Sequence, residues 1–277
     1  MKFLFIILFC LGAQAQSITT SNLNVGTLYF ASRLSNDATT NLNGLAATSG
    51  TQTYNPNVPN LGTNRQVWTW PVNLSCTCFD SASYQNVLLA PNVILLNGHY
   101  SPSTSWTFNF LDTNGVPYTA GITGLVQGAS DMVLGMMSSN LPPSVVVPWI
   151  LPPTFTNRIY GHSPVGFPAF WAHNKTSQLE AVVINSWVPG GTGGYLASMG
   201  FSSSTGYAKG GTGPMSGDSG SPTFFMIHNQ PVLLGAMTYS VGSFCCVSDG
   251  INWNVITNAL GGTNGLKILN LSSYPTF

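Results

Sequence analysis

A short serine segment flanked by glycines is the part of the sequence whose residue types point most directly to chemistry. It reads Gly217-Asp218-Ser219-Gly220. Glycines on both sides of a serine permit a tight turn in which the backbone approaches a substrate closely. Two backbone N–H groups in such a turn can point at one oxyanion. The segment is a candidate nucleophile loop, and a glycine-rich turn without any function is the alternative.

Two further residues are candidates to activate this serine, because a serine hydroxyl is a weak nucleophile without a neighbouring base. His99 follows a long apolar stretch directly and is the best candidate base among four histidines, with an ordinary surface histidine as the alternative. A base needs a carboxylate to orient it. Asp131 precedes the apolar run Met132-Val133-Leu134, where a carboxylate is costly unless it is hydrogen-bonded. It is the best candidate for that role.

The elements that must position these residues are expected to be strands. The chain has 277 residues, of which 44% are apolar, with 30 Gly and 18 Pro, and this mixture suits short strands joined by tight turns. A proline-flanked stretch over 141–153 is expected to link two halves. The only expected helix covers 252–260 and ends at Gly261-Gly262. Strands are expected at 25–31, 67–72, 86–90, 93–96, 106–111, 168–172, 179–187, 194–201, 223–227 and 231–239.

The charge of the chain excludes two classes of partner. Charged residues make up 5% of the sequence, and its 7 basic and 7 acidic residues leave a formal net charge of zero. Nucleic-acid binding needs a dense field of Lys and Arg, and docking on anionic membranes needs a basic cluster. We therefore expect neither nucleic acid nor an anionic membrane surface as a partner.

The N-terminal 15 residues predict a secretory signal peptide. Lys2 is followed by a short apolar run and then by Ala13-Gln14-Ala15, a small-residue cleavage pattern. We therefore expect a secreted protein without a membrane anchor. Cys10 raises a lipoprotein alternative, which Phe9 disfavours because a small residue is needed there. Residues 16–65 are rich in Asn, Thr, Ser and Gly and are expected to be an N-terminal extension or propeptide, a packed arm or a tether.

Four cysteines remain after the expected cleavage, and they lie in two short segments that are far apart in the sequence. They are Cys76, Cys78, Cys245 and Cys246. An even number in an exported protein favours disulfides between the two pairs, with the connectivity left open. A zinc site is the alternative, although the spacing is poor for one.

Three segments resemble the conserved blocks of chymotrypsin-like (trypsin-fold) serine proteases. The segment from Ala90 to His99 is similar to their histidine block, Asp131 to Leu134 to their aspartate block, and Gly217 to Pro222 to their serine block. The order also matches, and the resemblance covers about residues 66–265. It implies an all-β fold of two six-stranded antiparallel β-barrels with a short C-terminal helix. Residues 66–150 would form the barrel with the histidine and aspartate, and 151–277 the barrel with the serine.

The same resemblance implies a secreted serine endopeptidase that acts on proteins or peptides without a metal or organic cofactor. Ser219 would attack the carbonyl carbon, His99 would accept its proton, and Asp131 would hold the imidazole. The N–H groups of Gly217 and Ser219 would form the oxyanion hole.

A substrate pocket is implied at four positions. Gly213 would lie at its base, Ser240 and Gly250 at its walls, and Thr238 to Ser240 would pair with the substrate as an added strand. None of these residues is charged, which favours a neutral or apolar side chain before the scissile bond. Asp249 is next to the wall residue Gly250 in sequence, and its charge argues against a neutral pocket.

The sequence also departs from the family in ways that leave two alternatives open. Tyr100 stands where a cysteine usually follows the histidine, Met215 stands where a pocket cysteine is common, and the usual Ile-Val-Gly-Gly start is absent. In many relatives, cleavage of a precursor frees a new amino terminus that pairs with the aspartate corresponding to Asp218. This sequence has no obvious cleavage site for that step, and a cut after Arg65 would be one way to form such a terminus. The alternatives are a protease-like binding or adhesion protein without turnover and an unrelated β-rich binding protein.

Overall fold

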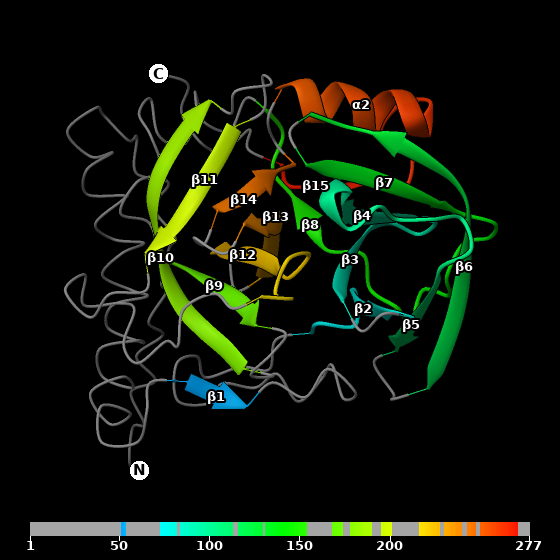
Figure 1. Ribbon diagram of the computed structural model, residues 1–277, viewed down its shortest axis with the longest axis horizontal. Helices are drawn as coiled ribbons and strands as arrows, with labels where there is room; N and C mark the ends of the chain where they lie inside the picture. Colours follow the sequence, from blue (N-terminus) through cyan, green and yellow to red (C-terminus); the bar gives the residue numbers. More distant parts are fainter. Residues whose placement is uncertain are drawn as a thin grey trace, which may run out of the picture.

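The described part of the chain forms a mostly β structure with an α-helix towards its C-terminal end (Figure 1). The structure is a computed structural model, which describes residues 51–53, 73–81, 84–112, 116–129, 131–153, 168–173, 178–189, 195–200, 216–227, 230–239, 243–247 and 250–270. The expected signal peptide and the strands expected at 25–31 and 67–72 lie outside these ranges.

Six antiparallel strands of the first half close into a barrel. The order around the barrel is β2-β3-β4-β7-β6-β5. A turn at Pro91 and Asn92 joins β3 to β4, as expected from the sequence. These strands confirm the ones expected at 86–90, 93–96 and 106–111. Their bounds are Thr77–Asp80 (β2), Gln85–Ala90 (β3), Val93–Asn97 (β4), Thr107–Leu111 (β5), Pro117–Gln127 (β6) and Met132–Met137 (β7).

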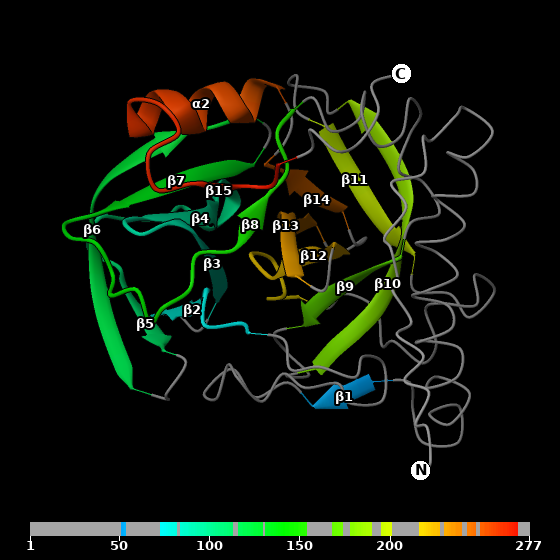
Figure 2. The same cartoon turned by 180° about the vertical axis from the view of Figure 1, so that it is seen from behind.

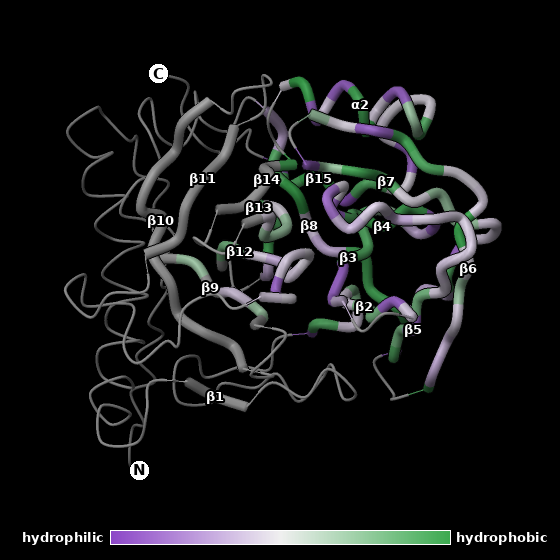
Figure 3. Tube along the Cα trace, viewed as in Figure 1, coloured by the Kyte–Doolittle hydropathy of each residue, from purple (hydrophilic) through white to green (hydrophobic). Residues whose placement is uncertain are grey.

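The apolar core of this barrel explains why its central strands are so hydrophobic. β3 and β4 are buried at every position, whereas β5 alternates between exposed and buried residues. A strand with one solvated face alternates, and a strand covered on both faces does not. β3 contacts Pro222–Ile227 (β12) and β4 contacts Gln230–Tyr239 (β13), so their second faces meet the other half of the molecule. In Figure 3 hydrophobic stretches follow β3 and β7.

The second half forms a nine-stranded sheet. Its main path is β12-β9-β10-β11-β14-β13-β8-β15, β1 pairs with β10, and β12 also pairs with β13. Five of its strands confirm those expected between 168 and 239. The bounds are Thr51–Thr53 (β1), Trp149–Ile150 (β8), Pro168–His173 (β9), Gln178–Pro189 (β10), Tyr195–Gly200 (β11), Pro222–Ile227 (β12), Gln230–Tyr239 (β13), Ser243–Cys246 (β14) and Lys267–Ile268 (β15).

The helix α2, Gly250–Leu260, confirms the helix expected near the C-terminus and begins two residues earlier than expected. Figures 1 and 2 show it lying over β6 and β7 from opposite sides of the molecule. The buried Asn252 fixes it there, because its Oδ1 accepts a hydrogen bond of 2.9 Å from the Ala129 N–H. Among the described residues, no helix has both the length and the hydropathy needed to cross a membrane.

The structure corrects the predicted disulfides. Cys76 and Cys78 are free thiols, buried in the hydrophobic core that the six-stranded barrel shares with the other half. Burial raises the pKa of Cys76 to about 12 and raises that of Cys78 well above its ordinary value. Cys245 and Cys246 belong to β14, which lies between β11 and β13 in the other sheet. The prediction that these two pairs are cross-linked is therefore wrong, because the sequence does not tell which core each segment joins.

Candidate active site

Strand pairing brings His99 next to Asp131. β4 and β7 are antiparallel, with Asn97 opposite Met132. The residues after Asn97 and the residue before Met132 must therefore lie together at one rim of the barrel. The Gly98 N–H donates to the Asp131 carbonyl oxygen at 2.7 Å, which fixes this arrangement. A short 3₁₀ turn, Gly98–Tyr100, then carries His99 outward.

The Asp131 carboxylate makes two hydrogen bonds with His99, one with its backbone and one with its ring. Its Oδ1 accepts the His99 backbone N–H at 2.7 Å, and its Oδ2 contacts the His99 ring at Nδ1. The Asp131 side chain is 8% exposed and the His99 side chain is 37% exposed. With Asp131 as the acceptor, Nδ1 carries the proton and Nε2 is the basic nitrogen. The half-exposed ring can thus receive a proton on the side away from Asp131.

Thr238 supplies a third hydrogen bond to the same carboxylate. Its hydroxyl donates to Asp131 Oδ2, and its side chain is fully buried at the end of β13. Sequence reasoning placed Thr238 at the substrate pocket and missed this contact. The sequence feature that could have indicated this contact is the position of Thr238, a hydroxyl-bearing residue at the end of the apolar run of β13. Because a buried carboxylate is costly without donors, these three hydrogen bonds make the position of Asp131 possible.

The backbone conformation of the Ser219 turn favours glycine on both sides of Asp218 and Ser219, and the packing around the turn requires it at Gly220. Gly217 and Gly220 have φ values of 92° and 89°, in the left-handed region. A Cβ on Gly220 would lie 2.0 Å from the Gln85 carbonyl oxygen of β3. The serine loop therefore lies directly against the six-stranded barrel. Its two interior residues, Asp218 and Ser219, are both buried.

Backbone hydrogen bonds fasten this turn to β13. The Gly220 N–H donates to the Met237 carbonyl oxygen at 2.7 Å, and the Met237 N–H donates to the Ser221 carbonyl oxygen at 2.9 Å. The Met237 carbonyl oxygen also accepts a hydrogen bond from the Asn97 side-chain amide of β4. Asn97 thus connects the strand that precedes His99 to the strand that holds the serine turn. Sequence reasoning did not identify this role.

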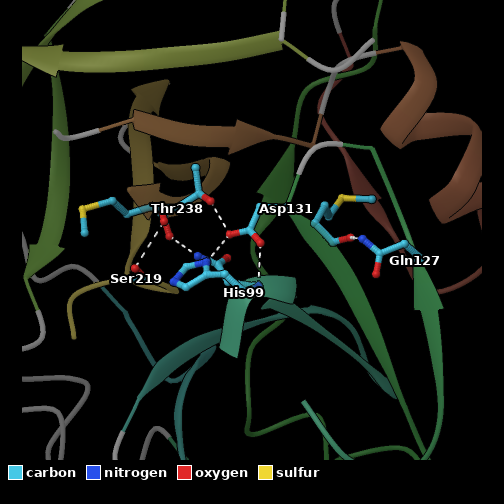
Figure 4. Close-up of polar contacts among 8 residues, drawn as sticks. His99, Gln127, Asp131, Ser219 and Thr238 are labelled. Carbon is cyan, nitrogen blue, oxygen red and sulfur yellow. Dashed lines mark hydrogen bonds and ion pairs between the residues drawn. The ribbon is translucent and has the colours of Figure 1, made fainter. Parts of the chain in front are cut away.

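Ser219 joins the cluster through Thr238. Its hydroxyl donates to the Thr238 carbonyl oxygen at 3.3 Å, while the Thr238 side chain donates to Asp131. Figure 4 draws the His99 ring between Ser219 and Asp131. The structure therefore brings His99, Asp131 and Ser219 into one site, although they come from three separate segments of the chain.

The implied pocket residues are not all brought to this site. Gly217 and Thr238 adjoin Ser219, whereas Gly250 is exposed at the start of α2, with open space where a Cβ would be. Gly213 and Ser240 lie outside the described residues, as do Met215 and Asp249. The pocket assignment remains a prediction. Within the described part of the chain, no group of three or more His, Cys, Asp or Glu residues could hold a metal ion.

In the comparisons with known proteins, no family model matches the chain and no curated protein matches it in sequence.

Proposed function

We propose that the chain is a serine endopeptidase of the chymotrypsin-like type, with Ser219 as nucleophile, His99 as base and Asp131 as orienting carboxylate. The observation that carries this proposal is the shared carboxylate: the His99 Nδ1 and the Thr238 hydroxyl both meet Asp131 Oδ2. Thr238 in turn accepts the hydrogen bond of Ser219. This arrangement favours the imidazole tautomer whose Nε2 can take a proton from serine.

The strand pairings support the two-barrel fold as part of this proposal. Six strands of the second half follow one another in the order β12-β9-β10-β11-β14-β13, and β12 pairs with β13. We infer that this ring is the second barrel. The serine turn leads into β12, as the resemblance to the protease family implies.

The reaction would proceed by acyl transfer. The Ser219 hydroxyl rotates from the Thr238 carbonyl oxygen to His99 Nε2 and attacks the carbonyl carbon of the scissile bond while its proton passes to His99. The negative charge on the carbonyl oxygen meets the N–H groups of Gly217 and Ser219. His99 then gives its proton to the leaving amine as the C–N bond breaks. A water molecule releases the acyl group by the same steps in reverse order, with His99 as its base.

The substrate proposed is a protein or peptide chain outside the cell. A neutral pocket formed by Gly213, Ser240 and Gly250 would select an uncharged or apolar side chain, and the edge beyond Thr238 would pair with the substrate backbone. Secretion rests on the N-terminal signal pattern alone.

A peptide-cleavage assay tests this proposal. Purified protein is incubated with a mixture of peptides of varied sequence, and the products are identified by mass spectrometry. We expect internal amide bonds to be cleaved by the wild type and left intact by Ser219→Ala. Cleavage that survives in Ser219→Ala would contradict the assignment of the nucleophile.

A binding protein with the same fold but no turnover is the second candidate. The hydrogen bond of the Ser219 hydroxyl to the Thr238 carbonyl oxygen favours it, because the serine proton is there directed away from a base. A folded wild-type protein that cleaves none of the peptides would support this candidate.

A further inference from the structure

Tyr100 lies beside the proposed nucleophile in a fixed orientation. It follows His99 in the 3₁₀ turn, and Ser101, with φ of 53°, closes the turn by donating its N–H to the Gly98 carbonyl oxygen at 2.8 Å. The Tyr100 ring stacks on Tyr84, with ring centroids 3.8 Å apart and an interplanar angle of 19°. Its centroid is 4.2 Å from that of His99. Packing on both neighbours leaves the ring little freedom to turn.

The hydroxyl of Tyr100 is buried and has no hydrogen-bond partner. It nevertheless approaches Ser219 closely enough for the serine hydroxyl and the serine backbone N–H to act on its pKa. A buried hydroxyl without a partner is uncommon in folded proteins, because it loses its hydrogen bonds to water without replacement. A hydroxyl in this state beside a nucleophile is suited to a partner that exists only during the reaction.

The protonation state of this phenol suits a donor. Burial raises the pKa of Tyr100, and the nearby Tyr84 and Asp218 raise it further, while the neighbouring polar groups of Ser219 lower it in part. The phenol therefore keeps its proton at neutral pH. It can donate a hydrogen bond to a developing negative charge without becoming charged itself.

We propose that Tyr100 is a further catalytic residue, whose hydroxyl donates a third hydrogen bond to the oxyanion beside the Gly217 and Ser219 N–H groups. This inference rests on the proposed endopeptidase function. As the bond between Ser219 Oγ and the carbonyl carbon forms, the electron pair of the C=O π bond moves to the carbonyl oxygen. The Tyr100 O–H then points to this oxygen and keeps its proton throughout. The hydrogen bond forms only in the transition state, so it acts on kcat rather than on KM.

Kinetics of Tyr100→Phe test the proposal, with Tyr118→Phe as a matched control on β6. The Tyr100→Phe variant keeps the stacked ring and loses only the hydroxyl. We expect kcat to fall by about 100-fold, as for loss of one oxyanion donor, with KM changed less than about threefold. The affinity for a peptidyl trifluoromethyl ketone, which forms a tetrahedral adduct, should fall by a similar factor. The affinity for a product-like peptide should stay unchanged, and the unfolding temperature should stay the same or rise, because the variant removes a buried hydroxyl without a partner.

Two outcomes would overturn this proposal while the endopeptidase function stands. An unchanged kcat in Tyr100→Phe would show that the hydroxyl makes no contact in the transition state. A raised kcat would show that the hydroxyl obstructs the oxyanion hole instead of completing it. A folded wild-type protein without cleavage or adduct formation would overturn the endopeptidase function, and this inference with it.

Discussion

At the scale of single residues, the site depends on how one carboxylate is supplied with donors. Asp131 lies at the rim of a hydrophobic barrel, and its donors come from the adjacent turn and from β13. The backbone N–H of His99 and the Thr238 hydroxyl hold its two oxygens, so the imidazole meets a carboxylate of fixed orientation. Loss of one donor should therefore affect both stability and activity.

Thr238→Val is expected to show this double effect. The change keeps the shape of the side chain but leaves Asp131 Oδ2 without one buried donor, which costs about 1–3 kcal/mol of unfolding free energy. Poorer orientation of the His99 imidazole that raises the activation free energy by about 1.4 kcal/mol would lower kcat about tenfold. Urea unfolding and peptide-cleavage kinetics measure the two effects. Thr238→Ser should retain both properties, and equal losses in the serine and valine variants would contradict this role of the hydroxyl.

The buried thiols of Cys76 and Cys78 predict a loss of stability at alkaline pH. Burial raises the pKa of the folded Cys76 from 9.0 to about 12, so the unfolded chain releases its proton first as the pH rises. Through Cys76, folding stability is therefore intact below pH 9 and falls between pH 9 and 12 by up to about 1.4 kcal/mol per pH unit, and Cys78 adds a fall in the same direction. Urea unfolding at several pH values measures this slope, which should be shallower in a Cys76→Ala, Cys78→Ala double variant.

Alkylation provides an independent control for the state of these thiols. Iodoacetamide should leave Cys76 and Cys78 unmodified in the native protein and modify both after denaturation without a reductant. Either residue recovered in a disulfide would contradict the free, buried thiols of the structure.

At the scale of elements, the serine turn is held between two parts of the fold. Gly220 lies against the backbone of β3, and its N–H pairs with the Met237 carbonyl oxygen of β13. The contact with β3 leaves no room for a side chain, since the nearest atom, the Gln85 carbonyl oxygen, belongs to the backbone and cannot turn away.

Gly220→Ala is therefore expected to displace the turn or destabilise the protein. A Cβ 2.0 Å from the Gln85 carbonyl oxygen, together with the φ of 89°, should cost more than about 2 kcal/mol. Gly250→Ala, at an open position in the first turn of α2, is the matched control. Urea unfolding compares the two variants, and an equal, small effect in both would contradict the close packing of the serine turn.

At the scale of the whole molecule, the site exists only where the two halves meet. His99 and Asp131 lie at the rim of the six-stranded barrel, whereas Ser219 lies in the turn before β12 and Thr238 lies in β13 of the nine-stranded sheet. The Asn97 amide bridges the halves by donating to the Met237 carbonyl oxygen. The site can therefore form only when the two halves are packed correctly against each other.

The sequence predicts the local features of this fold better than its long-range contacts. The strands around Pro91 and the helix ended by Gly261 are marked by local turn and periodicity signals, and the structure confirms both. The contact between Thr238 and Asp131 spans 107 positions, so no local pattern reveals it. The cysteine prediction was wrong for the same reason: which core a segment joins is decided by tertiary packing.

The most direct test of the central claim is labelling with a fluorophosphonate, which reacts with serines activated by a neighbouring base. The labelled protein is digested, and the modified residue is identified by mass spectrometry. The proposed site predicts covalent label on Ser219, none on Ser219→Ala at any position, and much slower labelling of His99→Ala. Folded wild-type protein that takes up no label, or label on a serine other than Ser219, would contradict an activated nucleophile at this site.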